Sequence, residues 1–240
     1  MIKFFRHIRQ RMIKENRVSK YLLYAIGEIV LVVIGILIAL QVNDWNESKK
    51  NRDYETKMLA EVVKALKTDK LNCEEHLDAY ATLGNAVIYF RDLAIAEVQF
   101  SDTLYPRFWE LNIGRYLQLN RGPYDALKSS GIDRISDDSL RNQLINFFDF
   151  ELLGFQGKLD HSTRNYRPSV ETLLSFLGDS RIENNNLVHG QIPSDILQRP
   201  EFLRLINNIE WRADNARGNI EAFIPEMDAL IEQINTEIGQ

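Results

Sequence analysis

The chain has 240 residues, of which 45% are hydrophobic and 26% are charged, a balance typical of one or two folded domains and incompatible with wholesale disorder. The single cysteine excludes an internal disulfide, and the sequence contains neither a glycine-rich phosphate loop nor a G-x-S-x-G nucleophile motif. The formal net charge of -5 is unevenly distributed, because residues 1–20 hold seven Lys/Arg against one acidic residue. This asymmetry predicts that the two ends of the chain lie in different surroundings.

The basic segment 1–20 has an apolar face. Ile2, Phe5, Ile8 and Met12 recur in it at helical spacing, with arginine and lysine elsewhere on the helical wheel. We therefore expect a basic amphipathic cytosolic helix that lies on membrane lipid. Nucleic acid is not an expected partner, because the apolar face and the apolar segment that follows both favour lipid.

Residues 21–45 are predicted to form a transmembrane helix. Tyr21–Val42 is almost wholly apolar, and a helix of that length spans roughly 33 Å, close to a hydrocarbon core of about 30 Å. No small-residue cleavage site follows the apolar run, so we expect an uncleaved signal anchor. The preceding cations predict a cytoplasmic N-terminus, with residues 46–240 on the outer side of the membrane. In a Gram-negative bacterium that arrangement is an inner-membrane anchor with a periplasmic domain.

Glu28 is an ionisable residue inside this predicted span. Gly35 and Ala39 follow it by seven and eleven residues, which places all three on one helical face. A carboxyl group within a membrane marks a functional site by default, and small residues allow helices to approach closely. We expect a transmembrane association or proton site here. The alternative is that Glu28 only extends toward the lipid headgroups.

Residues 46–240 are predicted to form an antiparallel helical bundle. The clearest pattern is a C-terminal seam that follows Pro200, with Pro225 outside it, in which spacings of four and three alternate. A first helix follows the span. Its apolar residues recur at spacing seven in one row, Leu59, Leu66, Cys73, Tyr80, Val87 and Ala94, with Val63, Leu77 and Gly84 in the adjoining row. The residues of the C-terminal seam are Phe202, Ile206, Ile209, Ala213, Ala216, Ile220, Phe223, Met227, Leu230 and Ile234.

Shorter elements are predicted between these two long helices. Pro123 and Gly131 bracket a short helix, and Ser136 is expected to cap a further helix. That further helix has a predicted apolar row and ends before Pro168, after which a short helix runs to Gly178. The expected linkers are Phe100–Pro106 and Ile182–Pro193. The apolar row comprises Leu144, Phe147, Phe148, Leu152, Phe155 and Leu159.

Candidate sites in the domain are few. Cys73 and His76 have the spacing of half a zinc site, but a structural site needs four ligands, so we interpret Cys73 as a small buried residue and expect no metal. No catalytic residue and no cofactor are expected. An aromatic stretch interleaved with arginines is a candidate recognition surface, and the alternative is that its rings close the end of the bundle. The residues of this surface are Arg107, Trp109, Arg115 and Tyr116.

Two stretches carry a family resemblance. The segment SKYLLYAIGEIVLVVIGILIALQVNDWNE (Ser19–Glu47) resembles the N-terminal signature of uncharacterised single-pass membrane proteins of Bacteroidota-type bacteria. YDALKSSGIDRISDDSLRNQLINFFD (Tyr124–Asp149) is similar to the central segment of the same family, a domain of unknown function. The resemblance implies a membrane location, a single-pass topology and a helical domain. It implies no activity, substrate or catalytic residue.

Three functional hypotheses follow. The leading one is a non-enzymatic membrane-anchored protein that binds or scaffolds a partner or self-assembles, as a homo-oligomer or with another membrane protein. The second is a ligand-binding sensory domain, which needs a partner that crosses the membrane because residues 1–20 contain no output domain. The third is a stator-like energy-coupling subunit that uses Glu28, an analogy of layout alone.

Overall fold

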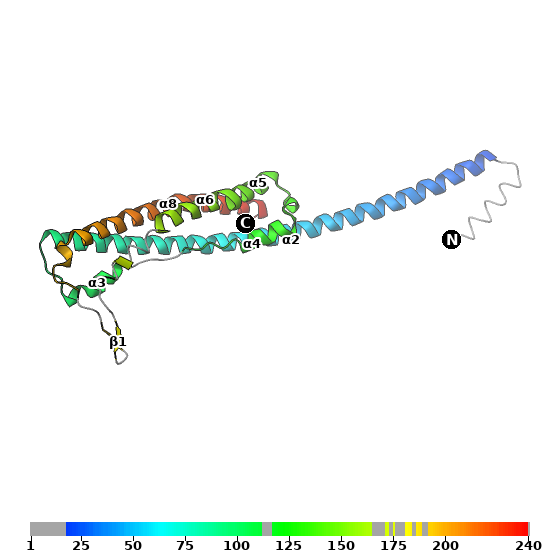
Figure 1. Cartoon of the computed structure of the whole chain (residues 1–240). Helices are drawn as coiled ribbons and strands as arrows, with labels where there is room; N and C mark the ends of the chain where they lie inside the picture. Colours follow the sequence, from blue (N-terminus) through cyan, green and yellow to red (C-terminus); the bar gives the residue numbers. More distant parts are fainter. Residues whose placement is uncertain are drawn as a thin grey trace. The chain divides into compact units, whose positions relative to one another are not determined.

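The computed structural model describes residues 18–111, 117–164, 171–172, 175, 181–183, 186–188 and 192–239. The chain divides into two compact units, Met1–Glu55 and Thr56–Gln240. The described residues are predominantly helical, which confirms the all-α prediction (Figure 1). The elements in chain order are α2 (Val18–Ile95), η1 (Asp102–Leu104), α3 (Tyr105–Glu110), α4 (Gly122–Gly131), η2 (Ile132–Arg134), α5 (Asp138–Asn146), π-helix η3 (Phe147–Glu151), α6 (Leu152–Arg164), β1 (Arg181–Glu183), β2 (Asn186–Val188), η4 (Ile196–Gln198) and α8 (Pro200–Ile238).

Helix α2 begins at Val18 and continues without interruption to Ile95, and no proline lies within this range. In the first unit its side chains from Leu22 to Val42 are almost all exposed. By length and composition the helix can cross a membrane, and none of its most apolar window is buried. The apolar helix predicted over 21–45 is therefore present, and its insertion into a membrane stays a prediction.

Helix α8 confirms the predicted C-terminal seam. All ten residues of that seam are buried, and Pro200 lies in the first turn of the helix. Pro225 lies inside the helix on its exposed side and does not end it. The helix ends at Gly239, whose φ of 73° places it in the left-handed region that glycine adopts without strain.

The second unit buries one face of α2 against the other helices. In the predicted row, Leu59, Leu66, Cys73 and Val87 are buried, whereas Tyr80 and Ala94 are half-buried. In the adjoining row Val63 is buried as predicted, but Leu77 and Gly84 are only half-buried. The row that completes the buried face instead has two polar members, Asp69 and His76, between apolar ones. That row comprises Val62, Asp69, His76, Leu83 and Phe90.

A π-helix interrupts the segment α5–η3–α6. Its wide turn adds one residue to the helical repeat, so the consecutive residues Phe147 and Phe148 are both buried. The rings of Phe147 and Phe155 stack on Phe223 of α8 with centroid distances of 5.3 and 4.2 Å. The predicted apolar row of this segment is buried throughout, which confirms it.

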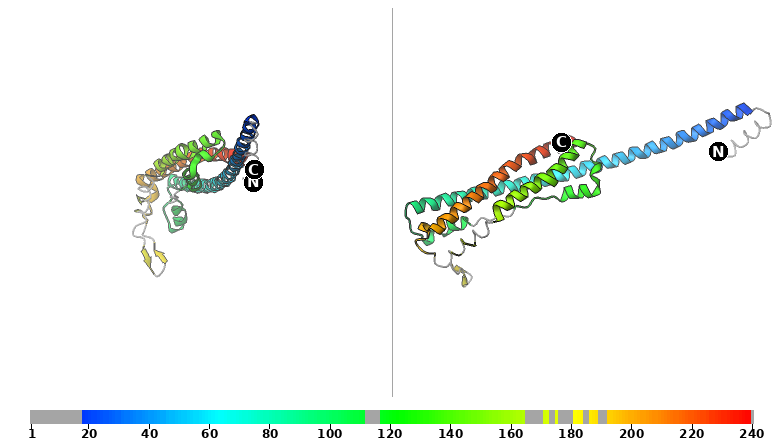
Figure 2. Two further views of the ribbon diagram at one scale, coloured as in Figure 1. Left: turned by 90° about the vertical axis from the view of Figure 1, so that its right-hand side faces the viewer. Right: turned by 45° about the horizontal axis from the view of Figure 1, so that its top comes forward.

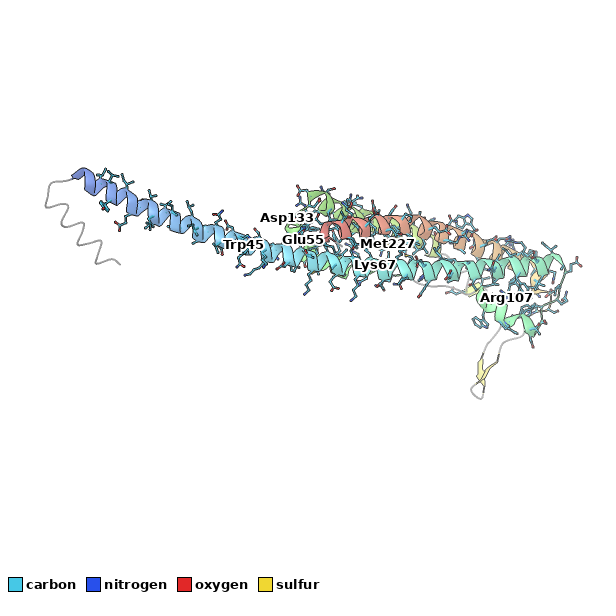
Figure 3. The ribbon with its side chains drawn as sticks, turned by 180° about the vertical axis from the view of Figure 1, so that it is seen from behind. Trp45, Glu55, Lys67, Arg107, Asp133 and Met227 are labelled. Carbon is cyan, nitrogen blue, oxygen red and sulfur yellow. The ribbon has the colours of Figure 1, made fainter. Side chains whose placement is uncertain are left out.

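Ion pairs and hydrogen bonds fix how the long helices pair. Lys70 of α2 pairs with Asp228 of α8 at 2.7 Å, and Arg91 pairs with Glu210. Because residues later in α2 meet residues earlier in α8, the two helices are antiparallel. Helix α6 also packs along α8, as Figures 1 and 2 show from different sides, and Met227 lies among these helices (Figure 3). The predicted antiparallel arrangement of these helices is thus observed.

Two predicted boundaries need correction. The N-cap of α5 is Asp137 rather than Ser136, because the Asp137 carboxylate accepts the backbone N–H of Leu140 at 2.9 Å. The short helix between Pro123 and Gly131 is confirmed as α4. The predicted linker Phe100–Pro106 instead contains η1 and the start of α3. Phe100 is buried there and donates its N–H to the carbonyl of Ser194 at 2.7 Å.

The second predicted linker, 182–193, contains most of the short antiparallel pair β1–β2, in which Ile182 faces Leu187. The amphipathic helix predicted over 1–20 lies mostly outside the described residues, which begin at position 18. Most of the helix predicted after Pro168 lies outside them too.

Candidate functional site

The three residues predicted as a transmembrane association or proton site lie on the exposed apolar part of α2. Glu28, Gly35 and Ala39 are all exposed in the single chain. A Cβ atom added at Gly35 would have no neighbour within 4 Å, and the same holds at Gly27. The face is therefore open, and larger side chains can be introduced there without disturbing the fold of the chain itself.

The candidate recognition surface is only partly described. Arg107 lies on α3, pairs with Glu110 at 2.9 Å and sits over the ring of Tyr89 (Figure 3). The side chain of Trp109 is exposed, at 36%. Arg115 and Tyr116 lie outside the described residues. Phe108, which lies between Arg107 and Trp109, is buried in a cluster of rings with Phe90, Phe100 and Phe202.

Cys73 and His76 do not form part of a metal centre in the described residues, among which no group of three potential ligands occurs. Cys73 is fully buried, and this burial raises the pKa of its thiol to about 12. His76 is 8% exposed, and its Nδ1 lies 2.7 Å from the carbonyl oxygen of Asn72. A carbonyl only accepts, so Nδ1 carries the proton. The buried Nε2 atom has no hydrogen-bond partner in the described part of the chain.

A polar network connects α4 to the π-helix. Arg121 donates from Nη1 to the carbonyl of Phe148 at 2.9 Å, and from Nη2 to Asp149 at 3.1 Å. Asp149 also accepts from the hydroxyl of Tyr124 at 3.0 Å and from Nζ of Lys128 at 2.5 Å. One carboxylate in the widened turn thus gathers three donors from the segment 121–128.

The charges of this network are matched. The ammonium group of Lys128 lowers the pKa of Asp149 most, with further lowering by Tyr124 and Arg121. Burial raises the pKa of the Tyr124 phenol, as does its hydrogen bond to Asp149. The ring of Tyr124 stacks on Phe148 at 4.4 Å. We interpret this network as structural, because it fixes α4 and the preceding loop against η3.

The loop before α4 forms one wall of a pocket. The pocket has a volume of about 760 Å³ and lies among α2, the segment 117–122 and α6, all within the second unit. Small-molecule sites typically have about 300–1,000 Å³ and a few convergent polar groups. The residues that line it are Thr68, Asp69, Asn72, Leu117, Gln118, Leu119, Asn120, Arg121, Gly122, Gln156, Leu159 and Asp160.

Asp69 is the most deeply buried polar residue of this lining, at 4% exposure. Its Oδ2 accepts the backbone N–H of Asn120 at 2.8 Å, which docks the loop on α2. Burial raises the pKa of its carboxyl, and the Asn120 hydrogen bond opposes this rise. Among the described residues no cation pairs with Asp69. The side-chain amides of Asn72, Gln118 and Gln156 likewise make no hydrogen bond within that part of the chain.

Sequence reasoning missed this pocket. Asp69 was a possible signal, because a polar residue at a buried position of a long apolar repeat needs a reason. The wall that Asn120 and Arg121 supply comes from a loop about fifty residues away, and nothing in the pattern of the loop predicts where it docks. Chemically, the pocket offers a buried carboxylate, amides and one apolar side. It is suited to binding a small polar molecule.

These features describe a helical protein with one membrane-length apolar helix segment and a polar pocket in its second unit. Residues 28–172 match the model described as "Family of unknown function (DUF6090)", and the chain therefore belongs to this family. The match starts inside Ser19–Glu47 and includes Tyr124–Asp149, the two stretches that carry the resemblance. No curated protein matches the chain, and no solved structure matches it.

Proposed function

We propose that the protein is a single-span membrane-anchored protein of a bacterial inner membrane, with a cytoplasmic N-terminus and a periplasmic helical domain that binds or scaffolds a partner. In this proposal it is not an enzyme and carries no cofactor. The observation that supports it best is the run of exposed apolar side chains from Leu22 to Val42 on the helix that also supplies one face of the bundle.

Burial explains why this run favours a membrane. Removing apolar surface from water gains roughly 25 cal/mol per Å², so an exposed run of more than twenty mostly apolar residues requires a cover. A lipid bilayer covers all sides of a single helix, whereas a protein core covers one face. The seven cations in residues 1–20 favour retention of that end in the cytoplasm.

A topology reporter tests the orientation. A fusion after Gln240 to an enzyme that is active only in the periplasm should be active, and the same fusion to a reporter that is active only in the cytoplasm should be silent. The full chain should sediment with membranes and resist extraction by alkaline carbonate. The reverse reporter pattern, or release by carbonate, would refute the anchor.

Glu28, Gly35 and Ala39 are the proposed face for self-association or for a membrane-protein partner. Small residues and a carboxyl can supply the close approach and polar contact that drive pairing in hydrocarbon. Gly35→Leu should reduce crosslinking in membranes at least several-fold. Gly27→Leu is the matched control, because both positions are open in the single chain but Gly27 lies about 80° away from Gly35 around the helix. Equal crosslinking of both variants and the unsubstituted chain would refute the face.

A proton-coupled, stator-like role makes a different prediction for Glu28. An amide cannot titrate but still forms hydrogen bonds, so Glu28→Gln would abolish function while crosslinking stays intact. Loss of crosslinking together with function would favour the association role instead.

The second candidate function is a ligand-binding sensory domain that works with a partner crossing the membrane. The specific observation in its favour is the 760 Å³ pocket with its buried Asp69. A scaffold has no need of such a pocket. Measurements of small-molecule binding to the full chain therefore separate the two candidates.

A further inference from the structure

The carboxylate of Asp69 requires a counter-charge. Buried charges in proteins are normally paired, because removing an ion from water costs several kcal/mol unless a partner compensates. Only 4% of Asp69 is exposed, and the residue lines the pocket. Within the described residues its carboxylate accepts only the neutral backbone N–H of Asn120. Its charge is therefore uncompensated there.

Docking of the loop does not account for the charge. The neutral amide of an asparagine would also accept the N–H of Asn120, in a weaker hydrogen bond but without the cost of burying an ion. The negative charge is thus surplus to the structural role of Asp69, and its position on the pocket wall makes it available to a ligand.

The other charged groups of the pocket do not supply a matching cation. Arg121 lines it, but its guanidinium donates to the carbonyl of Phe148 and is paired with Asp149 and Asp125. The lining of the pocket therefore contains the buried carboxylate of Asp69 and one guanidinium that is already matched by other carboxylates.

The remaining lining indicates what kind of cation fits. Asn72, Gln118 and Gln156 present amides, and Thr68 presents a hydroxyl, whereas Leu117, Leu119 and Leu159 form an apolar side. Amides in this number suit the neutral hydroxyl or amide groups of an organic molecule. A bare divalent ion fits less well, since such ions prefer several carboxylates and no group of three His, Cys, Asp or Glu side chains occurs among the described residues.

We propose that this pocket binds a small organic ammonium compound, whose charge pairs with Asp69 and whose neutral polar groups bond to the amide side chains. The inference deepens the sensory candidate function, because it names the class of ligand, and it does not depend on membrane topology. The topology reporter tests the orientation, and the binding titration tests the ligand. Each test can fail while the other succeeds, so failure of this proposal is distinguishable from failure of the proposed orientation.

Calorimetric titration of the full chain in a nonionic detergent tests the proposal. Two matched pairs serve as probes: glucosamine with glucose, and ethanolamine with ethylene glycol. Each pair replaces an ammonium by a hydroxyl at nearly constant size. At least one amine should bind at least tenfold more tightly than its neutral partner, and Ca²⁺ or Mg²⁺ alone should not compete.

Variants assign the binding to the pocket. Asp69→Asn keeps the acceptor for Asn120 and should weaken amine binding at least tenfold. Asp228→Asn removes an equal charge from the exposed pair with Lys70, outside the lining, and should leave binding within twofold. Thr68→Trp fills the pocket from an exposed position of α2 and should abolish binding without affecting the core, which keeps the test valid if Asp69→Asn misfolds.

Several outcomes would overturn the proposal. They are equal affinity for an amine and its neutral partner, unchanged amine binding by Asp69→Asn or Thr68→Trp in folded protein, and metal binding that displaces the amines. The proposal would also be overturned if neither glucosamine nor ethanolamine gave a binding heat at a concentration of about 10 mM. That concentration is on the order of ten times the Kd of a weak complex, about 1 mM.

Discussion

The buried rows of the two long helices differ in composition. The seam of α8 is apolar at all ten positions and buried throughout, whereas one buried row of α2 contains Asp69 and His76 between apolar residues. A face used only for packing has no reason to include groups that are costly to bury. The comparison therefore separates a face that stabilises the domain from one that also forms a site.

The largest effect is expected from a charge placed in the α8 seam. Ile220 is fully buried, so Ile220→Asp should cost more than about 4 kcal/mol, a large share of an ordinary domain's total stability of roughly 5–15 kcal/mol. Thermal unfolding followed by circular dichroism should show that the second unit is unfolded or strongly destabilised. An unchanged melting curve would mean that the seam is not a core.

A smaller loss is expected from removing a ring in the same seam. Phe223 stacks between Phe147 and Phe155, so Phe223→Ala leaves a cavity and should cost about 3–5 kcal/mol. Trp211→Ala is the control, because Trp211 lies on the same helix and is 57% exposed. Chemical denaturation should separate the two variants, and similar losses in both would show that burial does not set the cost.

The long helices could be predicted from sequence because their apolar repeats are long. Ten regularly spaced residues define the α8 seam, and every one of them is buried in the structure. The second buried row of α2 could not be predicted from apolar spacing because it contains Asp69 and His76; of the residues predicted in its place, only Val63 is buried. The π-helix was hidden because Phe147 and Phe148 are adjacent, and either one fits an ordinary α-helical repeat.

The N-cap of α5 and the pocket show two further limits of periodicity. Ser136 and Asp137 are both good caps, and only the hydrogen bond to Leu140 distinguishes them. The pocket depends on Asn120 meeting Asp69 across 51 residues of sequence, a long-range contact that no local pattern encodes. Residues of the predicted recognition surface were chosen by type, and the described ones, Arg107 and Trp109, lie outside the pocket lining.

The Asp149 network should give a moderate, pH-dependent effect. Asp149→Asn weakens bonds from three donors at a part-exposed site, so we expect a loss of about 1–2 kcal/mol at pH 7. Lys128 and its neighbours lower the pKa of Asp149 from its ordinary value of 3.8. The stabilisation is therefore full above pH 3.8 and is lost as pH falls through the lowered pKa of the folded state.

Thermal unfolding of the parent chain and Asp149→Asn at several pH values measures this effect. The difference in stability between them should be constant from about pH 5 to pH 7 and should shrink below about pH 4, near the ordinary Asp pKa of 3.8. A difference that grows on acidification would contradict the assigned ion pairs.

The smallest effect on stability, and the most direct test, is Asp69→Asn. Burial raises the pKa of Asp69, so the ionised carboxylate lowers the stability of the folded state at neutral pH. This cost disappears below the ordinary pKa of 3.8, where the carboxyl is protonated in both the folded and the unfolded chain. The free energy of unfolding at pH 7 should thus stay the same or rise by up to about 1 kcal/mol, since the amide still accepts the Asn120 N–H. A loss of more than about 1 kcal/mol would contradict the claim that the charge serves a site rather than the fold.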